Sequence, residues 1–319
     1  MKPDDVLVAI AAASVNPLDL KIWKGDFKAI LPGRFPLILG NDFAGTVMAI
    51  GANVTRFKIG DRVYARPDEA RTGTFAEQIA VAEADLALMP VSLSFTEAAS
   101  LPLVALTAWQ ALVEIANVQP GQKVLVHAGS GGVGTVAIQL AKHLGATVAT
   151  TASAENDGFV RSFGADIVVD YRKDDFSNVL SGYDVVLHSI GTEELDKSLA
   201  VLKPGGTLIS ISGPPDPAYA RRIGANGIVR LLIGILSLGI RRRARKKGVT
   251  YAFLFMRANG AQLSEITKLV DEGTIRPVIE RVFSFHNTLA ALKHADAGRT
   301  RGKVVIEMTS SVPAQQIGA

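Results

Sequence analysis

Hydrophobic and polar positions follow two different patterns along the chain. Over residues 1–95, short apolar runs alternate loosely with polar positions and are separated by glycine, which predicts a β-rich region. The expected strands of this region are Val6–Ala13, Asp42–Gly51, Asp61–Ala65 and Thr74–Val81. From Ser94 onward the apolar spacing becomes helical, and Ser94 and Thr96 stand where a helix cap would stand.

Residues 96–258 then alternate between short apolar runs and helical patterns, which predicts a parallel sheet with helical crossovers. The six expected strands are Lys123–Ala128, Thr147–Thr151, Ile167–Asp170, Val185–His188, Thr207–Ser212 and Val249–Phe255. A helix over 262–272 follows, then a strand over 278–285, a helix over 287–295 and a strand over 303–308. The tail, residues 309–319, is small and polar, and we expect it to be loose.

The junction between the apolar run Val124–Ala128 and the next helix carries the strongest chemical signal. It reads Gly-x-Gly-x-x-Gly, with a predicted strand before it and a predicted helix after it. Glycine lets the backbone approach a pyrophosphate, and the helix N-terminus offers unpaired N–H groups to that anion. We therefore predict that a dinucleotide is bound by Gly129, Ser130, Gly131, Gly132, Val133 and Gly134. The alternative is a plain turn whose glycines serve packing alone.

Six strands with crossovers is the number found in a complete dinucleotide-binding sheet. Because β character stands on both sides of this region, we expect an interrupted arrangement. Residues 96–258 would form the dinucleotide-binding domain, and residues 1–95 plus 259–319 would form the substrate domain.

The amino-acid composition excludes several classes of protein for this chain. The chain has 319 residues, of which 48% are hydrophobic and 20% are charged, as in an ordinary α/β protein. The net charge of +4 is too small to argue for a nucleic-acid partner. The chain has no cysteine, which excludes disulfides, a Cys-ligated zinc and a Cys nucleophile. The first seventeen residues lack the basic region of a signal peptide, so we expect a cytoplasmic location.

One apolar stretch, Ile228–Ile240, is too short to span a bilayer and runs directly into the basic stretch Arg241–Lys247. The two could lie on an anionic membrane as an interfacial helix. The alternative is a helix packed on its own domain or on a second subunit, followed by a solvated basic turn. The sequence favours the second interpretation, because one short segment gives weak anchoring.

Several longer strings, in this order, resemble the medium-chain dehydrogenase/reductase superfamily. They are SVNPLDLKIWKG (14–25), PLILGNDFAGTV (36–47), GDRVYA (60–65), GTFAEQIAV (73–81), AASLPLVALTAWQAL (98–112) and GKVVIEM (302–308). Within it the chain resembles the zinc-free quinone oxidoreductases and NADPH-dependent alkenal or enone reductases, which share the VNPxDxK string and the motif at Gly25–Ala29. The resemblance implies an α/β fold in which a Rossmann-type doubly wound parallel sheet is inserted in a GroES-like β-rich catalytic domain.

The resemblance has two departures. Relatives usually begin with about one further β-hairpin before the strand that aligns with Val6–Ala13, so either the start is misassigned or truncated, or the hairpin is lacking. The zinc-dependent branch has a Cys in the first segment and Gly-His-Glu where this chain has Gly40-Asn41-Asp42. Without these ligands a four-ligand zinc site cannot be assembled, so we expect no zinc.

The end of the second dinucleotide-domain strand bears on the choice of cofactor. NAD enzymes usually have an acid there, about 20 residues after the first glycine, and this chain has Ala152. We therefore expect NADPH rather than NADH, with Ser153 donating to the 2′-phosphate. By resemblance, Asn156 stands at a phosphate-binding Lys position and Tyr171 at a phosphate-binding Tyr position. The alternative for Tyr171 is a loop aromatic that covers the sheet edge, and nearby Glu155 could weaken phosphate binding.

Without a metal, hydride transfer to a conjugated acceptor is the easiest chemistry for such a site, and charge then builds on the acceptor oxygen. By resemblance Asn16 faces the nicotinamide, and Lys21 stands where several quinone reductases have a Tyr, so both are candidate catalytic residues. The alternatives are an Asn-Pro turn for Asn16 and a solvated surface charge for Lys21. Further cofactor contacts expected by resemblance, or from strand ends at the carboxyl edge, are Thr107, Gly191, Ile211, Ser212 and Lys303.

The predicted function is an NADPH-dependent, zinc-independent reductase of α,β-unsaturated carbonyls or quinones. The alternative is a non-catalytic NADPH-binding protein with a regulatory or structural role. We expect a small-molecule substrate and no nucleic acid. A homodimer is expected to form through the edge strand Val249–Phe255.

Overall fold

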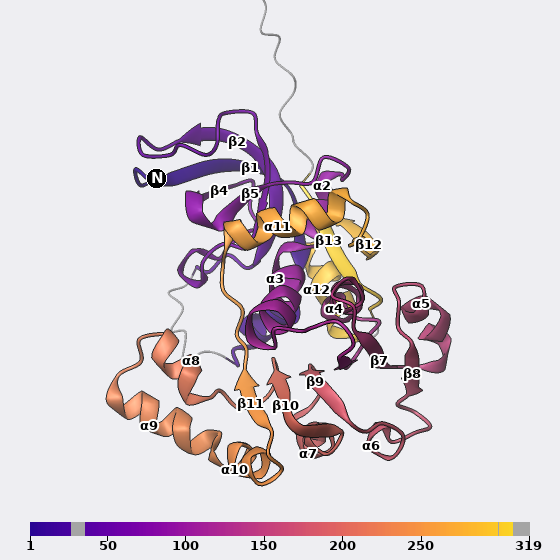
Figure 1. Cartoon of the computed structure of the whole chain (residues 1–319). Coiled ribbons are helices and arrows are strands. Elements are labelled where there is room, and N and C mark those ends of the chain that lie inside the picture. Colours follow the sequence, from indigo (N-terminus) through magenta and orange to yellow (C-terminus); the bar gives the residue numbers. More distant parts are fainter. Residues whose placement is uncertain (27–35, 299, 309–319) are drawn as a thin grey trace, which may run out of the picture. The chain divides into compact units, whose positions relative to one another are not determined.

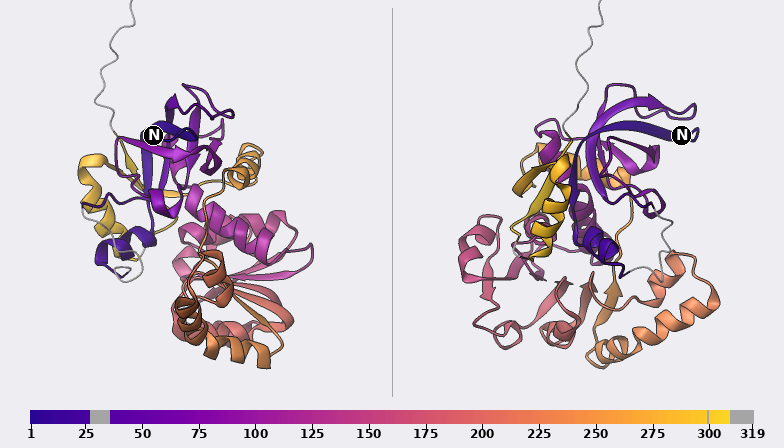
Figure 2. Two further views of the ribbon diagram at one scale, coloured as in Figure 1. Left: turned by 90° about the vertical axis from the view of Figure 1, so that its left-hand side faces the viewer. Right: turned by 180° about the vertical axis from the view of Figure 1, so that it is seen from behind.

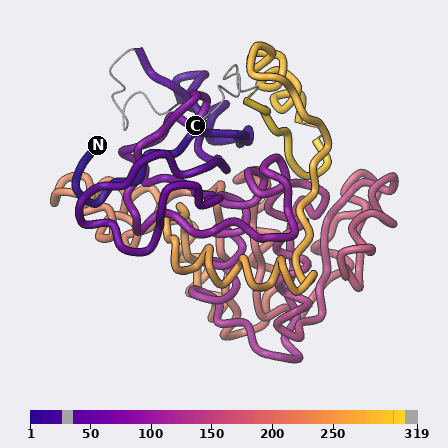
Figure 3. The backbone as a smooth tube through the Cα atoms, turned by 90° about the horizontal axis from the view of Figure 1, so that it is seen from above, coloured from indigo at the N-terminus to yellow at the C-terminus, as the bar shows by residue number. Residues whose placement is uncertain are grey.

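A computed structural model describes residues 1–26, 36–298 and 300–308 (Figure 1). Most of the predicted motif at 25–29 and the tail 309–319 lie outside these residues. Contacts divide the chain into two units, which Figure 3 traces along the backbone. Unit 1 comprises Met1–Leu106 and Arg257–Ala319, and unit 2 comprises Thr107–Met256.

Unit 1 is built on a mixed sheet whose centre is the long first strand. Its strands are β1 (Asp5–Val15), β2 (Asp42–Ile50), β3 (Arg62–Ala65), β4 (Gln78–Ala82), β5 (Leu86–Leu88), β12 (Ile279–Ser284) and β13 (Lys303–Glu307). The order is β12-β13-β1-β2-β3-β5, and β4 pairs with β1. All neighbours are antiparallel except β12 and β13. The first and last strands of the chain therefore lie side by side.

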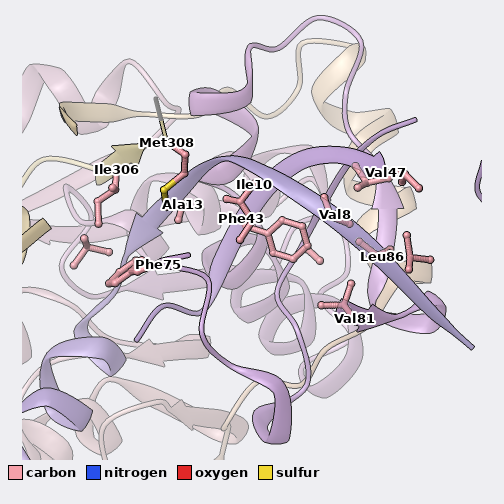
Figure 4. Packing of buried hydrophobic residues seen from close by; sticks show 14 of the residues in the cluster. Val8, Ile10, Ala13, Phe43, Val47, Phe75, Val81, Leu86, Ile306 and Met308 are labelled. Atoms are coloured by element: carbon pink, nitrogen blue, oxygen red, sulfur yellow. The ribbon is translucent and has the colours of Figure 1, made fainter. Parts of the chain in front are cut away.

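Apolar side chains from β1, β2 and β13 form the core of unit 1. Figure 4 shows Val8, Ile10 and Phe43 packed in this core, with Ile306 from the last strand. The helices of unit 1 are α1 (Pro17–Lys24), α2 (Phe95–Ala99), α11 (Gly260–Asp271) and α12 (Thr288–Asp296). The helix α3 (Pro102–Trp109) runs from unit 1 into unit 2 and continues as a π-helical turn over Gln110–Ile115. The short 3-10 turns of unit 1 are Glu69–Arg71, Glu83–Asp85 and Phe285–Asn287.

One predicted strand of unit 1 is shorter than expected. The alternation over Thr74–Val81 predicted a strand throughout, but only Gln78–Ala82 pairs with β1. The N–H groups of Gly73 and Phe75 instead donate to the carbonyls of Gly40 and Leu39. A loop that binds another loop through its backbone cannot join the ladder, so the prediction was wrong at this end.

Unit 2 is a six-stranded parallel sheet. Its strands are β6 (Lys123–Val126), β7 (Thr147–Ala152), β8 (Ile167–Asp170), β9 (Tyr183–His188), β10 (Leu202–Ser210) and β11 (Thr250–Phe253). The order is β11-β10-β9-β6-β7-β8, and every neighbouring pair is parallel. Numbered within the unit this is 3-2-1-4-5-6, the order of a doubly wound Rossmann sheet. The predicted fold of this region is confirmed.

The helices of unit 2 follow the strands. They are α4 (Gly132–His143), α5 (Asp157–Arg161), α6 (Phe176–Val179), α7 (Leu195–Ala200), α8 (Pro217–Arg222), α9 (Gly227–Leu236) and α10 (Leu238–Lys246), with 3-10 turns at Ala154–Asn156 and Thr192–Glu194. Figure 2 shows α8, α9 and α10 gathered beside the edge strand β11. Among the described residues, no helix is long and apolar enough to cross a bilayer.

The strand order of unit 2 indicates which edge of the sheet binds a ligand. Successive strands are added on one side of β6 up to β8 and on its other side from β9 onward, and ligands of such sheets bind at the carboxyl ends beside this switch. The glycine turn follows β6, and Gly191 follows β9.

Candidate functional site

The turn after β6 has glycine where a side chain would not fit. A Cβ on Gly129 would lie 2.1 Å from the Thr150 hydroxyl oxygen, and one on Gly134 would lie 2.3 Å from the Ala128 carbonyl oxygen. Ala128 itself has φ 53°, a left-handed conformation that is uncommon for a residue with a side chain. Close packing thus explains Gly129 and Gly134, and the sharp turn at Ala128 directs the chain into α4.

Gly131 is different, because packing does not require it. A Cβ there would meet only the Ala128 carbonyl oxygen, at 3.4 Å. Gly131 is the N-cap of α4, and no side chain caps this helix. The first N–H groups of α4 are thus left for a ligand, and the turn fits the pyrophosphate of a dinucleotide. Ser130, Gly132 and Val133 are half-buried in the same turn.

A chain of hydrogen bonds, here called the histidine chain, runs beneath this turn. The Ala128 N–H donates to the Thr151 hydroxyl oxygen at 3.1 Å, and that hydroxyl lies 3.2 Å from His127 Nδ1. His127 Nε2 lies 3.1 Å from the Ser198 hydroxyl oxygen, which lies 3.0 Å from His188 Nδ1. His188 Nε2 lies 3.1 Å from the Gly191 carbonyl oxygen. The chain joins the glycine turn to the loop after β9.

The end of the histidine chain fixes its direction. A carbonyl only accepts, so His188 Nε2 carries the hydrogen and His188 Nδ1 accepts from Ser198. Ser198 then accepts from His127 Nε2, and His127 Nδ1 accepts from Thr151. Burial, with the neighbouring His188, lowers the pKa of His127 to about 3, and burial also lowers that of His188. Both imidazoles are neutral, so they are hydrogen-bonded core residues.

The loops after β9 and β10 are tied together at the same edge. The Ser212 hydroxyl donates to the Ile190 carbonyl at 2.6 Å, and the Ile211 N–H donates to the His188 carbonyl at 3.0 Å. The Ser189 hydroxyl donates to the His127 carbonyl at 3.1 Å. Predicted cofactor residues Gly191, Ile211 and Ser212 are thereby brought to the edge that carries the glycine turn.

Three small polar side chains lie together near the end of β7, those of Ser130, Ser153 and Asn156. Ala152 and Ser153 are buried, at 2% and 3% exposure. The Asn156 amide nitrogen donates to the Ser153 hydroxyl at 3.0 Å and to the Ser130 hydroxyl at 3.4 Å. Position 152 is an alanine, so an anion held by these donors would not meet a carboxylate at that position.

Two charged residues flank this group. The Ser153 hydroxyl donates to a Glu155 carboxylate oxygen at 3.2 Å, and Arg172 donates to the same oxygen at 3.1 Å. The Arg172 guanidinium lies 5.8 Å from the centre of the Tyr171 ring, which is 59% exposed. Glu155 thus accepts from donors that a 2′-phosphate would use, and the sequence analysis had noted that it could weaken phosphate binding. Arg172 supplies a cation to which the sequence analysis gave no role.

Unit 1 buries a second polar group, here called the Asn16 cluster. Its members are Ser14, Asn16, Asp19, Asn41, Asp42 and Lys303. The Asn16 amide nitrogen donates to Asp42 Oδ2 at 2.9 Å and to the Ser14 carbonyl at 3.3 Å, and its amide oxygen accepts from Lys303 Nζ. Lys303 Nζ also donates to the Val15 carbonyl at 3.0 Å and lies 3.5 Å from Asp42 Oδ2. Both amide hydrogens of Asn16 are thus used inside unit 1.

Asp19 holds the start of α1. Its carboxylate accepts from the Asn16 N–H at 2.7 Å, from the Gly40 N–H at 3.1 Å and from the Asn41 side chain at 2.7 Å. Complete burial raises the pKa of Asp19 to about 6, although these donors act in the opposite direction. Burial lowers the pKa of Lys303. Asn16 therefore stands at the N-cap position of α1, where the sequence alone indicated only an Asn-Pro turn, and its backbone N–H donates to Asp19.

The other predicted residues lie apart from these groups. Lys21 is exposed on the last turn of α1, and Thr107 is buried in α3 at 3% exposure. Thus Asn16 and Lys303 are brought together in unit 1, and the glycine turn, Ser153, Asn156, Gly191, Ile211 and Ser212 share one sheet edge in unit 2.

Sequence reasoning missed residues that support these sites. Asp19 could have been found, because an N-cap followed three residues later by an acid is the spacing of a capping box. Nothing in the local sequence indicates that Ser198 joins His127 to His188, since the three residues come from separate elements.

Comparison with known proteins shows to which family this chain belongs. Residues 2–91 match a family model described as alcohol dehydrogenase GroES-like domain, and residues 163–306 match one described as zinc-binding dehydrogenase. The chain is 35% identical to NAD(P)H oxidoreductase RTN4IP1, mitochondrial, of Danio rerio, covering 96% of this chain and 84% of that protein. The chain belongs to the medium-chain dehydrogenase/reductase superfamily.

Two further relatives define its branch. The chain is 34% identical to the NADPH-dependent alkenal/one oxidoreductase, chloroplastic, of Arabidopsis thaliana, over 96% of this chain and 72% of that one. The solved quinone oxidoreductase from Coxiella burnetii is 32% identical, with a TM-score of 0.84 over 97% of this chain and 92% of that one. The branch is that of the quinone oxidoreductases and alkenal reductases, as the sequence predicted, and its proteins are oxidoreductases. The GroES-like part of the predicted fold is confirmed with it.

In this member of the family, the Gly40-Asn41-Asp42 segment binds protein groups. Asn41 donates to Asp19, and Asp42 accepts from Ser14 and Asn16. Within the described ranges, no three His, Asp or Glu side chains gather as a metal site would require.

Proposed function

We propose that this chain is an NADPH-dependent reductase of conjugated acceptors, either α,β-unsaturated carbonyls or quinones. The observation that carries the proposal is the uncapped α4 N-terminus at the Gly129–Gly134 turn, beside a strand end where Ala152 replaces an acid. The names of the Arabidopsis and Coxiella relatives, an alkenal/one oxidoreductase and a quinone oxidoreductase, support the two acceptor classes.

Residues of unit 2 would hold the cofactor. The N–H groups of the glycine turn would bind the pyrophosphate, and Ser153, Asn156 and Tyr171 would bind the 2′-phosphate. Arg172 would join them by exchanging Glu155 for the phosphate, a stronger acceptor. Gly191, Ile211, Ser212 and Thr107 are proposed to contact the nicotinamide half, and bound NADPH would supply the hydride. Lys303 was also predicted to reach the cofactor, but its internal bonds favour a role in holding Asn16.

Residues of unit 1 would serve the acceptor. Charge develops on the acceptor oxygen during reduction, and a donor near that oxygen lowers the barrier. Asn16 would have to leave Ser14 or Asp42 to donate, whereas the exposed Lys21 would not have to break a described bond. We propose Lys21 as the donor to the acceptor oxygen and Asn16 as a second, weaker candidate.

A steady-state assay of 2-alkenals and quinones with NADPH and with NADH tests the function. NADPH oxidation with at least one acceptor class is expected. Tight NADPH binding with no oxidation on any acceptor would instead favour a regulatory or structural role.

The cofactor choice has its own test. Ala152→Asp is expected to lower kcat/KM for NADPH by about tenfold or more, because the new carboxylate would face the phosphate. Ala154→Asp, on the exposed side of the same loop, is the control for a general charge effect. Equal losses in both variants, or no preference for NADPH in the parent, would contradict the assignment.

We also propose a homodimer that pairs through β11, which is an edge strand of its sheet. Light scattering in solution tests it. A cytoplasmic location stays a prediction, and two of the relatives carry the words mitochondrial and chloroplastic in their names.

A further inference from the structure

The helices α9 and α10 follow each other with only Ser237 between them. Ser237 has φ −93° and ψ 0°, so the chain stays in the right-handed helical region across the junction. One stripe of this helix pair faces unit 2, because Ser237, Ile240 and Ala244 are buried and Ile233 is half-buried. Their spacing of three or four residues is that of a single helix face.

The opposite face of α9 is apolar and exposed. Its five most exposed apolar side chains are Ile228 (74%), Leu231 (65%), Leu232 (54%), Ile235 (57%) and Leu236 (66%). Positions i, i+3, i+4, i+7 and i+8 lie on one side of a helix, so these five form one continuous surface. No residue of α9 is fully buried, although Ile233 is half-buried and the helix contacts α8 and α10. Packing on its own domain or on a second subunit, which the sequence favoured, stays a prediction.

The surroundings of this surface are basic. Residues 217–264 contain no Asp or Glu. On α10, Arg242, Arg245 and Lys246 are exposed, while Arg243 pairs with Asp196 at 2.5 Å. An apolar helix face thus continues into an exposed basic one. Of the two helices, α10 packs against the edge strand β11 and α9 against α8 and α10 (Figure 1).

We propose that α9 and α10 dock unit 2 on a membrane surface that carries anionic lipid. The apolar face of α9 lies at the boundary between headgroups and acyl chains, and the basic side chains of α10 lie among the headgroups. Charge favours this occupant over a second copy of the chain. An anionic surface complements the basic side chains of α10, whereas the same region of a second copy offers them no acidic partner, because residues 217–264 contain no Asp or Glu.

Co-sedimentation of the full chain with lipid vesicles tests the proposal. Binding is expected to phosphatidylcholine vesicles that contain about 30% phosphatidylglycerol, and little to phosphatidylcholine alone. Raising the salt from about 0.1 M to about 0.5 M is expected to weaken binding, because salt screens the headgroup charge.

Paired variants separate the two faces. Leu231→Asp with Ile235→Asp is expected to weaken vesicle binding at least tenfold, and Val179→Asp, an equally exposed apolar site in α6, is the control. Arg242→Gln with Lys246→Gln is expected to weaken it about 25-fold, since each lost charge near the surface is worth about fivefold. Lys58→Gln with Lys293→Gln removes the same charge elsewhere and is expected to change little.

The proposal is overturned if the chain does not bind anionic vesicles, or if the control variants weaken binding as much as the test pairs. Light scattering, which measures the oligomeric state, distinguishes a membrane from a second copy of the chain as the occupant of this face. If the parent is a dimer that Leu231→Asp with Ile235→Asp converts to a monomer, and the parent does not bind vesicles, a second copy covers the face. Circular dichroism checks that each variant is folded, which we expect because the substituted side chains are exposed.

Discussion

Each unit buries a hydrogen-bonded polar group next to residues predicted for the site, but one group is charged and the other is neutral. In the Asn16 cluster, the ammonium of Lys303 meets the carboxylate of Asp42 and the amide of Asn16. In the histidine chain, each hydroxyl or neutral imidazole donates one hydrogen bond to the next member, from Thr151 to the Gly191 carbonyl.

The difference shows two ways to fix a polar side chain in a core. In the neutral chain, each imidazole has one donor and one acceptor nitrogen, and each nitrogen has a matching partner. If a ring gains a proton, its acceptor nitrogen becomes a donor and faces another donor. A charged cluster tolerates several acceptors around one ammonium, but removing that ammonium leaves a buried charge. The two groups should therefore respond differently to mutation and oppositely to acid. The two tryptophans allow separate readings, because Trp23 is in unit 1 and Trp109 is in unit 2.

The largest effect is expected from Lys303→Met. This change removes the ammonium that contacts Asp42 while keeping most of the side-chain volume, so we expect a loss of about 3–5 kcal/mol in the free energy of unfolding. Urea unfolding followed by Trp23 in a Trp109→Phe background measures it. Lys293→Met, at an exposed position of the same unit, is the control. A loss below about 1 kcal/mol would mean that the cluster does not depend on its cation.

The histidine chain should make unit 2 less stable in acid. The pKa of His127 is about 3 in the folded chain and near 6.5 when exposed, so unfolding takes up a proton between these values. The free energy of unfolding should then fall by about 1.4 kcal/mol per pH unit as the pH drops below 6.5. His127→Gln, which can still accept from Thr151 and donate to Ser198, should flatten this loss when Trp109 fluorescence is followed in a Trp23→Phe background. An unchanged slope in the variant would show that His127 does not titrate on unfolding.

Asp19 should give the opposite slope in unit 1. Its folded pKa of about 6 lies above the ordinary value of 3.8, so unfolding releases a proton between these values. This group alone makes the folded chain more stable as the pH falls from about 6 to about 4, by roughly 2–3 kcal/mol in all. Asp19→Asn should remove this gain, so the variant should lose more stability than the parent over the same window. Parallel curves for the two proteins, read from Trp23, would contradict the raised pKa.

The smallest effect is expected from Ser198→Ala. The change leaves the hydrogen on His127 Nε2 and the acceptor His188 Nδ1 without their shared partner, at a cost of about 1–2 kcal/mol. Ser162→Ala, an exposed serine of the same unit, should cost less than about 0.5 kcal/mol. Thermal unfolding of unit 2 compares them, and equal effects would show that Ser198 contributes no more than a surface hydroxyl.

The two regions also differ in how far the sequence predicts them. The doubly wound sheet follows from alternating strands and helices, because each predicted apolar run overlaps a strand and the glycine turn fixes the first crossover. The predicted residues on its carboxyl edge come together for the same reason, since parallel strands end at one edge.

The Asn16 cluster could not be predicted in this way. Asn16, Asp42 and Lys303 lie on three strands or strand ends that antiparallel pairing brings together, and pairing partners are not encoded in a local pattern. The same limit applies to the apolar stretch 228–240. Its periodicity predicts a helix, but which face is covered depends on distant residues.

The pairing of β1 with β13 has a consequence for how the chain is made. Ala12–Val15 pair with β13, so this end of the central strand lacks one neighbour until β13 has left the ribosome. Unit 2 needs no residue beyond Met256 and can assemble earlier during synthesis. This short β edge is open while unit 2 is being synthesised, and a chaperone that shields such edges would act on Ala12–Val15 during that interval.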